Sequence, residues 1–198
     1  MRDDRRQFIE GVFHDWWEGL TDSKNDGRRA DRAALARLRR LDMADFGQGL
    51  EPDLTLALGE DGFRKLYRRI RAIKDLPEDY EPDLVTAAVT LARIRKDAAK
   101  RKTAAMLGGP DDDARKMKEV RFLRLMRVST SGDLFNEARR LAALLDRQAP
   151  VGELGASLLL WRHVPRVRRD WARAYYGLDT EGLEPTETDI AKPEPASP

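Results

Sequence analysis

The residues of this chain best suited to chemistry with another molecule are arginines on two consecutive amphipathic segments, separated by a short turn at residues 128–132. Apolar residues recur three and four positions apart in both segments, which predicts two helices. Arginine is permanently charged, and its planar fork matches the oxygens of a phosphate group. Residues 115–147 hold nine Lys and Arg against four Asp and Glu. The segments are therefore a candidate surface for nucleic-acid backbone, and the candidate arginines are Arg121, Arg124, Arg127, Arg139 and Arg140.

Two further basic groups occur earlier in the chain. Arg39 and Arg40 stand near the end of a helix predicted to finish at about Leu41. The run 93–102 holds six cations and one acid, and it ends in Lys100, Arg101 and Lys102. Charge runs on helices are often only solvated faces. We nevertheless include all five residues as secondary candidates for nucleic-acid binding, because several basic helices occur in one chain.

Helical periodicity extends over most of the chain, and no segment shows convincing strand-like alternation. The pattern predicts an all-α fold of about eight helices, with a possible boundary between two helical bundles near 108–110. The four tryptophans fall on or beside apolar stripes, so we expect them in the core. We expect helices at about 5–20, 28–41 and 63–73, with a helical turn near Leu54. A further helix should begin at Pro82 and continue into 93–102. Residues 111–113 should cap the next helix, and after the two arginine segments we expect helices at 154–161 and, following a break at Pro165, at 167–178.

Motifs that would indicate an enzyme are missing from the sequence. His14 and His163 are the only histidines, each stands near a tryptophan, and such residues are more often packed or partly exposed than catalytic. The sequence has no nucleophile elbow, no phosphate-cradling glycine loop and no HExxH motif. Asp111, Asp112 and Asp113 could bind Mg²⁺, but acids at a helix N-terminus explain them better. We predict a non-catalytic protein without a metal or other cofactor.

The composition divides the chain into a basic body and an acidic tail. The whole chain carries +2, and residues 179–198 hold six acids against one lysine, so residues 1–178 carry +7. The tail has four prolines and no aromatic residue, which is typical of a disordered segment. The chain has no cysteine, no apolar run long enough for a membrane helix and no signal-peptide pattern. We expect a soluble cytoplasmic protein with a helical body at 1–178.

The order of these features resembles the CasB family, the small subunit of the type I-E CRISPR surveillance complex called Cascade. The resemblance covers about residues 5–178 and leaves out the acidic tail. The elements that carry it are Trp16 to Leu20, Asp31 to Arg40, Val120 to Arg127, Leu134 to Leu145 with its paired arginines, Leu158 to Trp161, and Val167 to Tyr176.

The resemblance implies a non-enzymatic helical subunit that is present as a head-to-tail pair of copies and contacts other Cascade subunits. It also implies contacts with the guide RNA and with target DNA, notably the displaced strand. Base pairing supplies specificity in an RNA-guided complex, so the protein needs backbone contacts rather than base readout. The family pattern assigns this role to Arg121, Arg127, Arg139 and Arg140, with at least one helix arginine pairing instead with Glu119 or Glu137.

Two other functions fit the residues. One is a helical scaffold that binds only proteins, which would show no salt-dependent binding to DNA. The other is a DNA-binding transcription regulator, since the two arginine segments and their turn could imitate a helix-turn-helix; such a protein would prefer one operator sequence.

The acidic tail is predicted to contribute nothing to folding. Truncation after Leu178 should leave the helical circular-dichroism signal and the melting temperature nearly unchanged. Affinity for nucleic acid should stay equal or rise slightly, because the truncation removes five net negative charges. Loss of the cooperative melting transition in the truncated protein would contradict this prediction.

Overall fold

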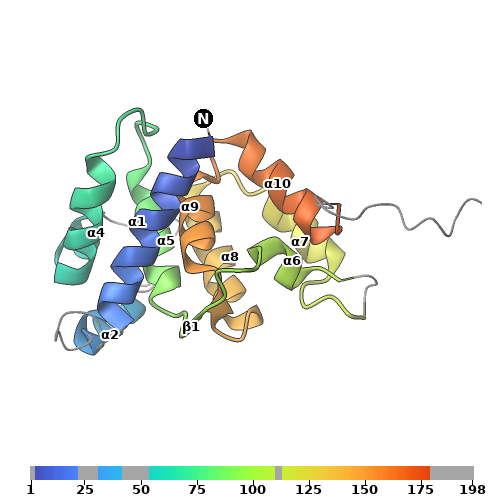
Figure 1. Cartoon of the computed structure of the whole chain (residues 1–198), viewed down its shortest axis with the longest axis horizontal. Coiled ribbons are helices and arrows are strands. Elements are labelled where there is room, and N and C mark those ends of the chain that lie inside the picture. The colour runs from blue at the N-terminus through green and yellow to red at the C-terminus, as the bar shows by residue number, and fades with distance from the viewer. Residues whose placement is uncertain (1–2, 22–30, 42–53, 110–112, 179–198) are drawn as a thin grey trace, which may run out of the picture.

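The computed structural model describes residues 3–21, 31–41, 54–109 and 113–178. Within these ranges the chain forms ten α-helices and one parallel pair of two-residue strands, so the predicted all-α class is confirmed (Figure 1). The helices are α1 (Asp3–Thr21), α2 (Arg32–Arg40), α3 (Leu54–Leu58), α4 (Asp61–Arg71), α5 (Glu81–Leu91), α6 (Thr103–Leu107), α7 (Glu119–Met126), α8 (Ser131–Leu144), α9 (Val151–Leu160) and α10 (Pro165–Tyr175). The strands are β1 (Lys96–Asp97) and β2 (Gln148–Ala149).

Local sequence signals account for several helix boundaries. Pro82 and Pro165 lie in the first turns of α5 and α10, where a missing N–H costs nothing. The predicted break at Pro165 is therefore the start of a new helix. Thr130 caps α8, because its hydroxyl accepts a hydrogen bond from the backbone N–H of Asp133.

The prediction that the helix after Pro82 continues into residues 93–102 is wrong. Helix α5 ends at Leu91, and Lys96 and Asp97 then pair with Gln148 and Ala149. The carboxylate of Asp97 accepts a hydrogen bond from the backbone N–H of Val151, the first residue of α9. Pairing with a distant segment thus overrides the local helical preference of this basic run.

The N-cap predicted at residues 111–113 is also wrong for Asp113. Helix α7 begins at Glu119, and its N-cap position is Lys118. Asp113 instead approaches the Lys118 side chain, with 3.4 Å between Oδ1 and Nζ. Residues 111 and 112 lie outside the described ranges, as does the predicted tail at 179–198.

Helix α9 occupies the centre of the fold. It packs against α1 and α5, and α5 also packs against α8. Eight of the ten residues of α9 are buried, so this helix has no polar face. One hydrophobic cluster extends from Ile9 to Tyr175 and contains residues from both sides of 108–110. The boundary between two bundles stays a prediction.

All four tryptophans are buried, as predicted. Trp16 and Trp17 donate their indole N–H groups to the carbonyl oxygens of Gly62 and Leu91, so the first helix is tied to α4 and α5. The rings of Trp161 and Trp171 meet edge to face with centroids 4.9 Å apart, in a geometry that aromatic pairs prefer.

Aromatic stacking fixes the position of α7 at the edge of the fold. The ring of Phe122 lies 3.8 Å from that of Tyr175 on α10, with only 4° between the planes. The Tyr175 hydroxyl donates to the carbonyl oxygen of Met117, just before α7. None of the described helices is long and apolar enough to cross a membrane.

The close approach of α9 to α1 depends on Gly155. A Cβ atom there would lie 2.5 Å from Cγ of Phe13. We expect Gly155→Ala to lower the free energy of unfolding by about 1–3 kcal/mol, the usual cost of overpacking a core. Urea denaturation would measure this change.

Gly11→Ala is the matched control, because a Cβ at this helical position meets nothing within 4 Å. It should raise the free energy of unfolding by up to about 1 kcal/mol through higher helix propensity. Equal effects of the two substitutions would contradict the packing argument.

Candidate nucleic-acid interface

Helix α7 carries its arginines on the side away from the core. Phe122 and Leu125 are fully buried, whereas Arg124 and Arg127 are exposed and Arg121 is half-buried. The arginines are spaced by three residues, so they line one side of the short helix. Their neighbour Val120 is 83% exposed, which adds an apolar side chain to this basic surface.

A buried carboxylate on α8 gathers three of the predicted arginines. Glu137 lies 2.6 Å from Nη2 of Arg124, 2.8 Å from Nη1 of Arg140 and 3.9 Å from Nε of Arg121. The Glu137 side chain is only 7% exposed, while those of Arg124 and Arg140 are more than half exposed. Glu137 therefore fixes the inner ends of these arginines and leaves much of each guanidinium in solvent. The expected pairing of a helix arginine with Glu137 is confirmed.

The surface beside these ion pairs is hollowed. A hollow of about 680 Å³, which we call the α7 hollow, is lined by Lys118, Val120, Arg121, Arg124, Arg127 and Arg140. No carboxylate lies among its described lining residues. Arg127 forms no ion pair within the described part of the chain.

A second hollow adjoins the first. It measures about 650 Å³, and we call it the arginine hollow because its lining comprises Arg39, Arg93, Arg95, Arg139, Arg140 and Arg147 together with Asn136, Ala142 and Ala143. Arg140 lines both hollows, so the basic surface is continuous between them. The guanidinium of Arg139 also lies 5.9 Å from the ring centroid of Phe135, close enough for a cation–π contact.

The arginine hollow joins segments that are far apart in the sequence. It combines the end of α2, the segment after α5, the outer face of α8 and the turn before β2. Burial, followed by the nearby charges of Arg95 and Arg147, lowers the pKa of Arg39. Arg95 and Arg147 therefore lie close enough to Arg39 to repel it.

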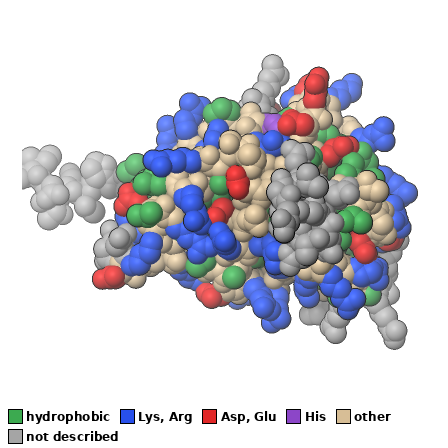
Figure 2. Space-filling view, turned by 180° about the vertical axis from the view of Figure 1, so that it is seen from behind, with side chains coloured by type: hydrophobic (Ala, Val, Ile, Leu, Met, Phe, Trp, Pro, Cys, Tyr) green, Lys and Arg blue, Asp and Glu red, His purple; other side chains and the backbone are tan. Residues whose placement is uncertain are grey.

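Figure 2 shows the molecule from behind, the side on which α7 and α8 lie in Figure 1. Lys and Arg side chains are more numerous there than Asp and Glu side chains. The described lining of the two hollows contains ten cations and no acid.

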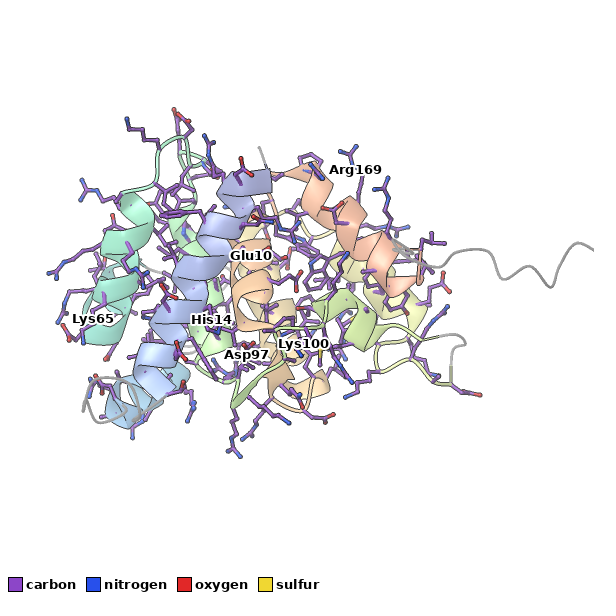
Figure 3. All side chains as sticks on the ribbon, in the orientation of Figure 1. Glu10, His14, Lys65, Asp97, Lys100 and Arg169 are labelled. Atoms are coloured by element: carbon purple, nitrogen blue, oxygen red, sulfur yellow. The ribbon has the colours of Figure 1, made fainter. Side chains whose placement is uncertain are left out.

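The structure brings six of the ten predicted residues together in this surface: Arg39, Arg121, Arg124, Arg127, Arg139 and Arg140. Arg101 and Lys102 instead line a third hollow, where the acids Glu10, Glu153 and Asp170 are also present. Arg40 and Lys100 line none of the three hollows, and Figure 3 shows Lys100 in the segment between β1 and α6.

Sequence reasoning missed four cations of the surface, namely Lys118, Arg93, Arg95 and Arg147. All four belong to the two basic stretches counted in the sequence. Composition therefore gave a signal for them, but spacing along the chain gave none that could single them out.

Both histidines are packed or partly exposed, as predicted. Nε2 of His163 lies 2.9 Å from Oδ2 of the buried Asp83, whose carboxylate also accepts a hydrogen bond from Arg162. Burial raises the pKa of Asp83, and Arg162 opposes that shift. Nε2 of His14 lies 3.4 Å from Oδ2 of Asp97 (Figure 3).

Within the described ranges no three His, Cys, Asp or Glu residues are grouped to hold a metal ion.

Fold and surface together define a helical protein with an arginine-lined face. A family model for CRISPR-associated protein Cse2 matches residues 34–176, and the chain belongs to this family, which is the CasB family of the resemblance above. Membership implies a subunit of the CRISPR complex Cascade. Comparison with curated proteins and with solved structures gives no match.

The role of Glu137 yields a prediction about stability. Glu137→Gln removes the buried charge that balances Arg124 and Arg140 and keeps the shape of the side chain. We expect the free energy of unfolding to fall by about 1–3 kcal/mol, because the partners of a charged hydrogen-bonded network are left uncompensated. Chemical denaturation at neutral pH would measure the loss.

Asp146→Asn makes the same chemical change at an exposed residue, whose carboxylate pairs with Lys116 at 2.6 Å. The expected effect is within about 0.5 kcal/mol. A loss at Asp146 as large as that at Glu137 would show that burial of the carboxylate is not what matters.

Proposed function

We propose that this Cse2-family protein is a non-catalytic Cascade subunit that binds nucleic-acid backbone and stabilises the displaced strand of target DNA. Its partners would be the other Cascade subunits, a second copy of itself, the guide RNA and the target DNA. The observation that carries the proposal is the pair of adjoining hollows lined by ten cations and no described acid.

The chemistry of the surface suits backbone rather than base recognition. Nine of the ten cations are arginines, which form paired hydrogen bonds to phosphate oxygens. Asn136 is the only amide side chain among the described lining residues, so the surface offers little that reads base edges.

In an R-loop, the guide RNA pairs with one strand of the target DNA and displaces the other strand. A small contribution from contacts to the displaced strand has a large effect on the stability of this structure. The RNA–DNA hybrid that forms is about as stable as the DNA duplex that it replaces. Contacts to the phosphates of the displaced strand therefore shift a nearly balanced equilibrium toward the open state.

Salt dependence of binding tests the backbone contacts. Arg124→Gln combined with Arg127→Gln should leave folding intact, because Glu137 keeps Arg140 at 2.8 Å. The slope of log affinity against log salt should become shallower by about two units, one for each phosphate that the variant no longer neutralises. Fluorescence anisotropy with several unrelated oligonucleotides would measure the slope.

Arg68→Gln combined with Arg71→Gln is the matched control. Both residues are exposed on α4, the helix that carries Lys65 in Figure 3 and lies at the opposite end of the molecule from α7. The control should bind nucleic acid nearly as wild type does. In a reconstituted complex, the α7 variant should load guide RNA normally and give a lower R-loop yield.

Three results would reject the proposal. Absence of binding at low salt would favour a scaffold that contacts only proteins. Strong preference for one duplex sequence would favour a transcription regulator. Equal salt slopes for the α7 and α4 variants would show that net charge, rather than this surface, drives binding.

A further inference from the structure

Arg140 lines both hollows, but Arg39 and Arg93 in the arginine hollow are oriented by different groups from the arginines of the α7 hollow. In the α7 hollow a buried carboxylate, Glu137, pairs with Arg124 and Arg140. In the arginine hollow, Arg39 donates from Nε to the carbonyl oxygen of Ala92, at the end of α5. Arg93 donates to the carbonyl oxygens of Val89 at 2.8 Å and Arg39 at 3.0 Å. Carbonyl oxygens orient a guanidinium without cancelling its charge.

The close approach of neighbouring arginines affects the pKa of Arg39. Its pKa is lowered by burial and then by Arg95 and Arg147. Repulsion between like charges disfavours the empty hollow, and a bound anion would relieve it. The six arginines that line the hollow and the like charges around Arg39 are both features that suit a bound anion.

The backbone beside the hollow is strained as well. Asp146 and Arg147 are consecutive residues with φ of 53° and 59°, a region that side chains other than glycine rarely adopt. The carbonyl oxygen of Arg147 accepts a hydrogen bond from the backbone N–H of Arg95 at 2.7 Å. Strained positions of this kind concentrate at binding sites, where they hold a side chain in place.

We propose that the arginine hollow is a binding site for a compact polyphosphate group, which means two or more phosphates that fit together into the volume of one small ligand. A single phosphodiester carries one negative charge. Six arginines line the hollow, and although Arg140 pairs with Glu137, Arg39 still lies near the charges of Arg95 and Arg147. A volume of about 650 Å³ is that of an ordinary small-molecule site.

Two natural sources have this chemistry: successive phosphates of a flexible single strand, and a small molecule that carries a pyrophosphate. The first source rests on the proposed function, and the second does not. The site itself can be tested without nucleic acid.

Inorganic pyrophosphate is the probe for this site. Isothermal titration of the full-length protein should show one site per chain, with an affinity at least about tenfold higher than that for inorganic phosphate at matched ionic strength. Arg39→Gln combined with Arg147→Asn should weaken pyrophosphate binding by about tenfold or more. Asparagine tolerates positive φ, so Arg147→Asn alone should keep or raise the melting temperature while it weakens binding.

One control variant separates the site from general charge. Arg68→Gln with Arg71→Gln on α4 removes equal charge outside the arginine hollow and should leave pyrophosphate affinity unchanged. The proposal is overturned if pyrophosphate binds no better than phosphate, if the double variant in the hollow binds normally, or if the α4 variant loses as much affinity.

Competition identifies the source. Displacement of bound pyrophosphate by oligothymidylate would assign the site to a nucleic-acid strand. Retention of pyrophosphate at saturating oligothymidylate would assign it to a small polyphosphate. If the proposed function is wrong, oligonucleotides should not bind while pyrophosphate still does. If the pyrophosphate site is wrong, pyrophosphate should bind no better than phosphate, so the two failures can be distinguished.

Discussion

The burial of α9 between α1 and α5 is the constraint on which the rest of this structure depends. The helix is apolar on nearly every side, so it can be stable only inside the protein. Its close contact with α1 requires the bare backbone at Gly155, since Phe13 fills the space that a side chain would take. The start of α9 also binds the carboxylate of Asp97, which draws the segment after α5 toward the turn that follows α8. A packing requirement thus brings Arg95 and Arg147 together.

Helix existence could be predicted from the sequence, because apolar spacing, proline and capping signals agree along most of the chain. Thr130, Pro82 and Pro165 lie where their types predict. The run 93–102 could not be predicted in the same way. Its composition favours a helix, but pairing with Gln148 and Ala149 is a long-range event that leaves no local pattern.

The candidate surface was predictable to a similar degree. Arg140 and Glu137 are three residues apart on one helix, so their ion pair could be expected from spacing alone. The meeting of Arg39, Arg95 and Arg147 could not, because it depends on how α2, the strand segment and the turn after α8 are arranged. Lys100 was predicted as a binding residue, but it lines none of the three hollows, although it belongs to the same basic run as Arg95.

The two adjoining hollows use different means to hold arginines at a protein surface. Glu137 stabilises its partners strongly but cancels one of their charges, so the α7 hollow gains rigidity and loses some attraction for phosphate. The carbonyl oxygens that accept from Arg39 and Arg93 give weaker bonds and carry no net charge of their own. Arg140 belongs to both hollows, so the carboxylate that orients the arginines of α7 also holds one arginine of the neighbouring hollow.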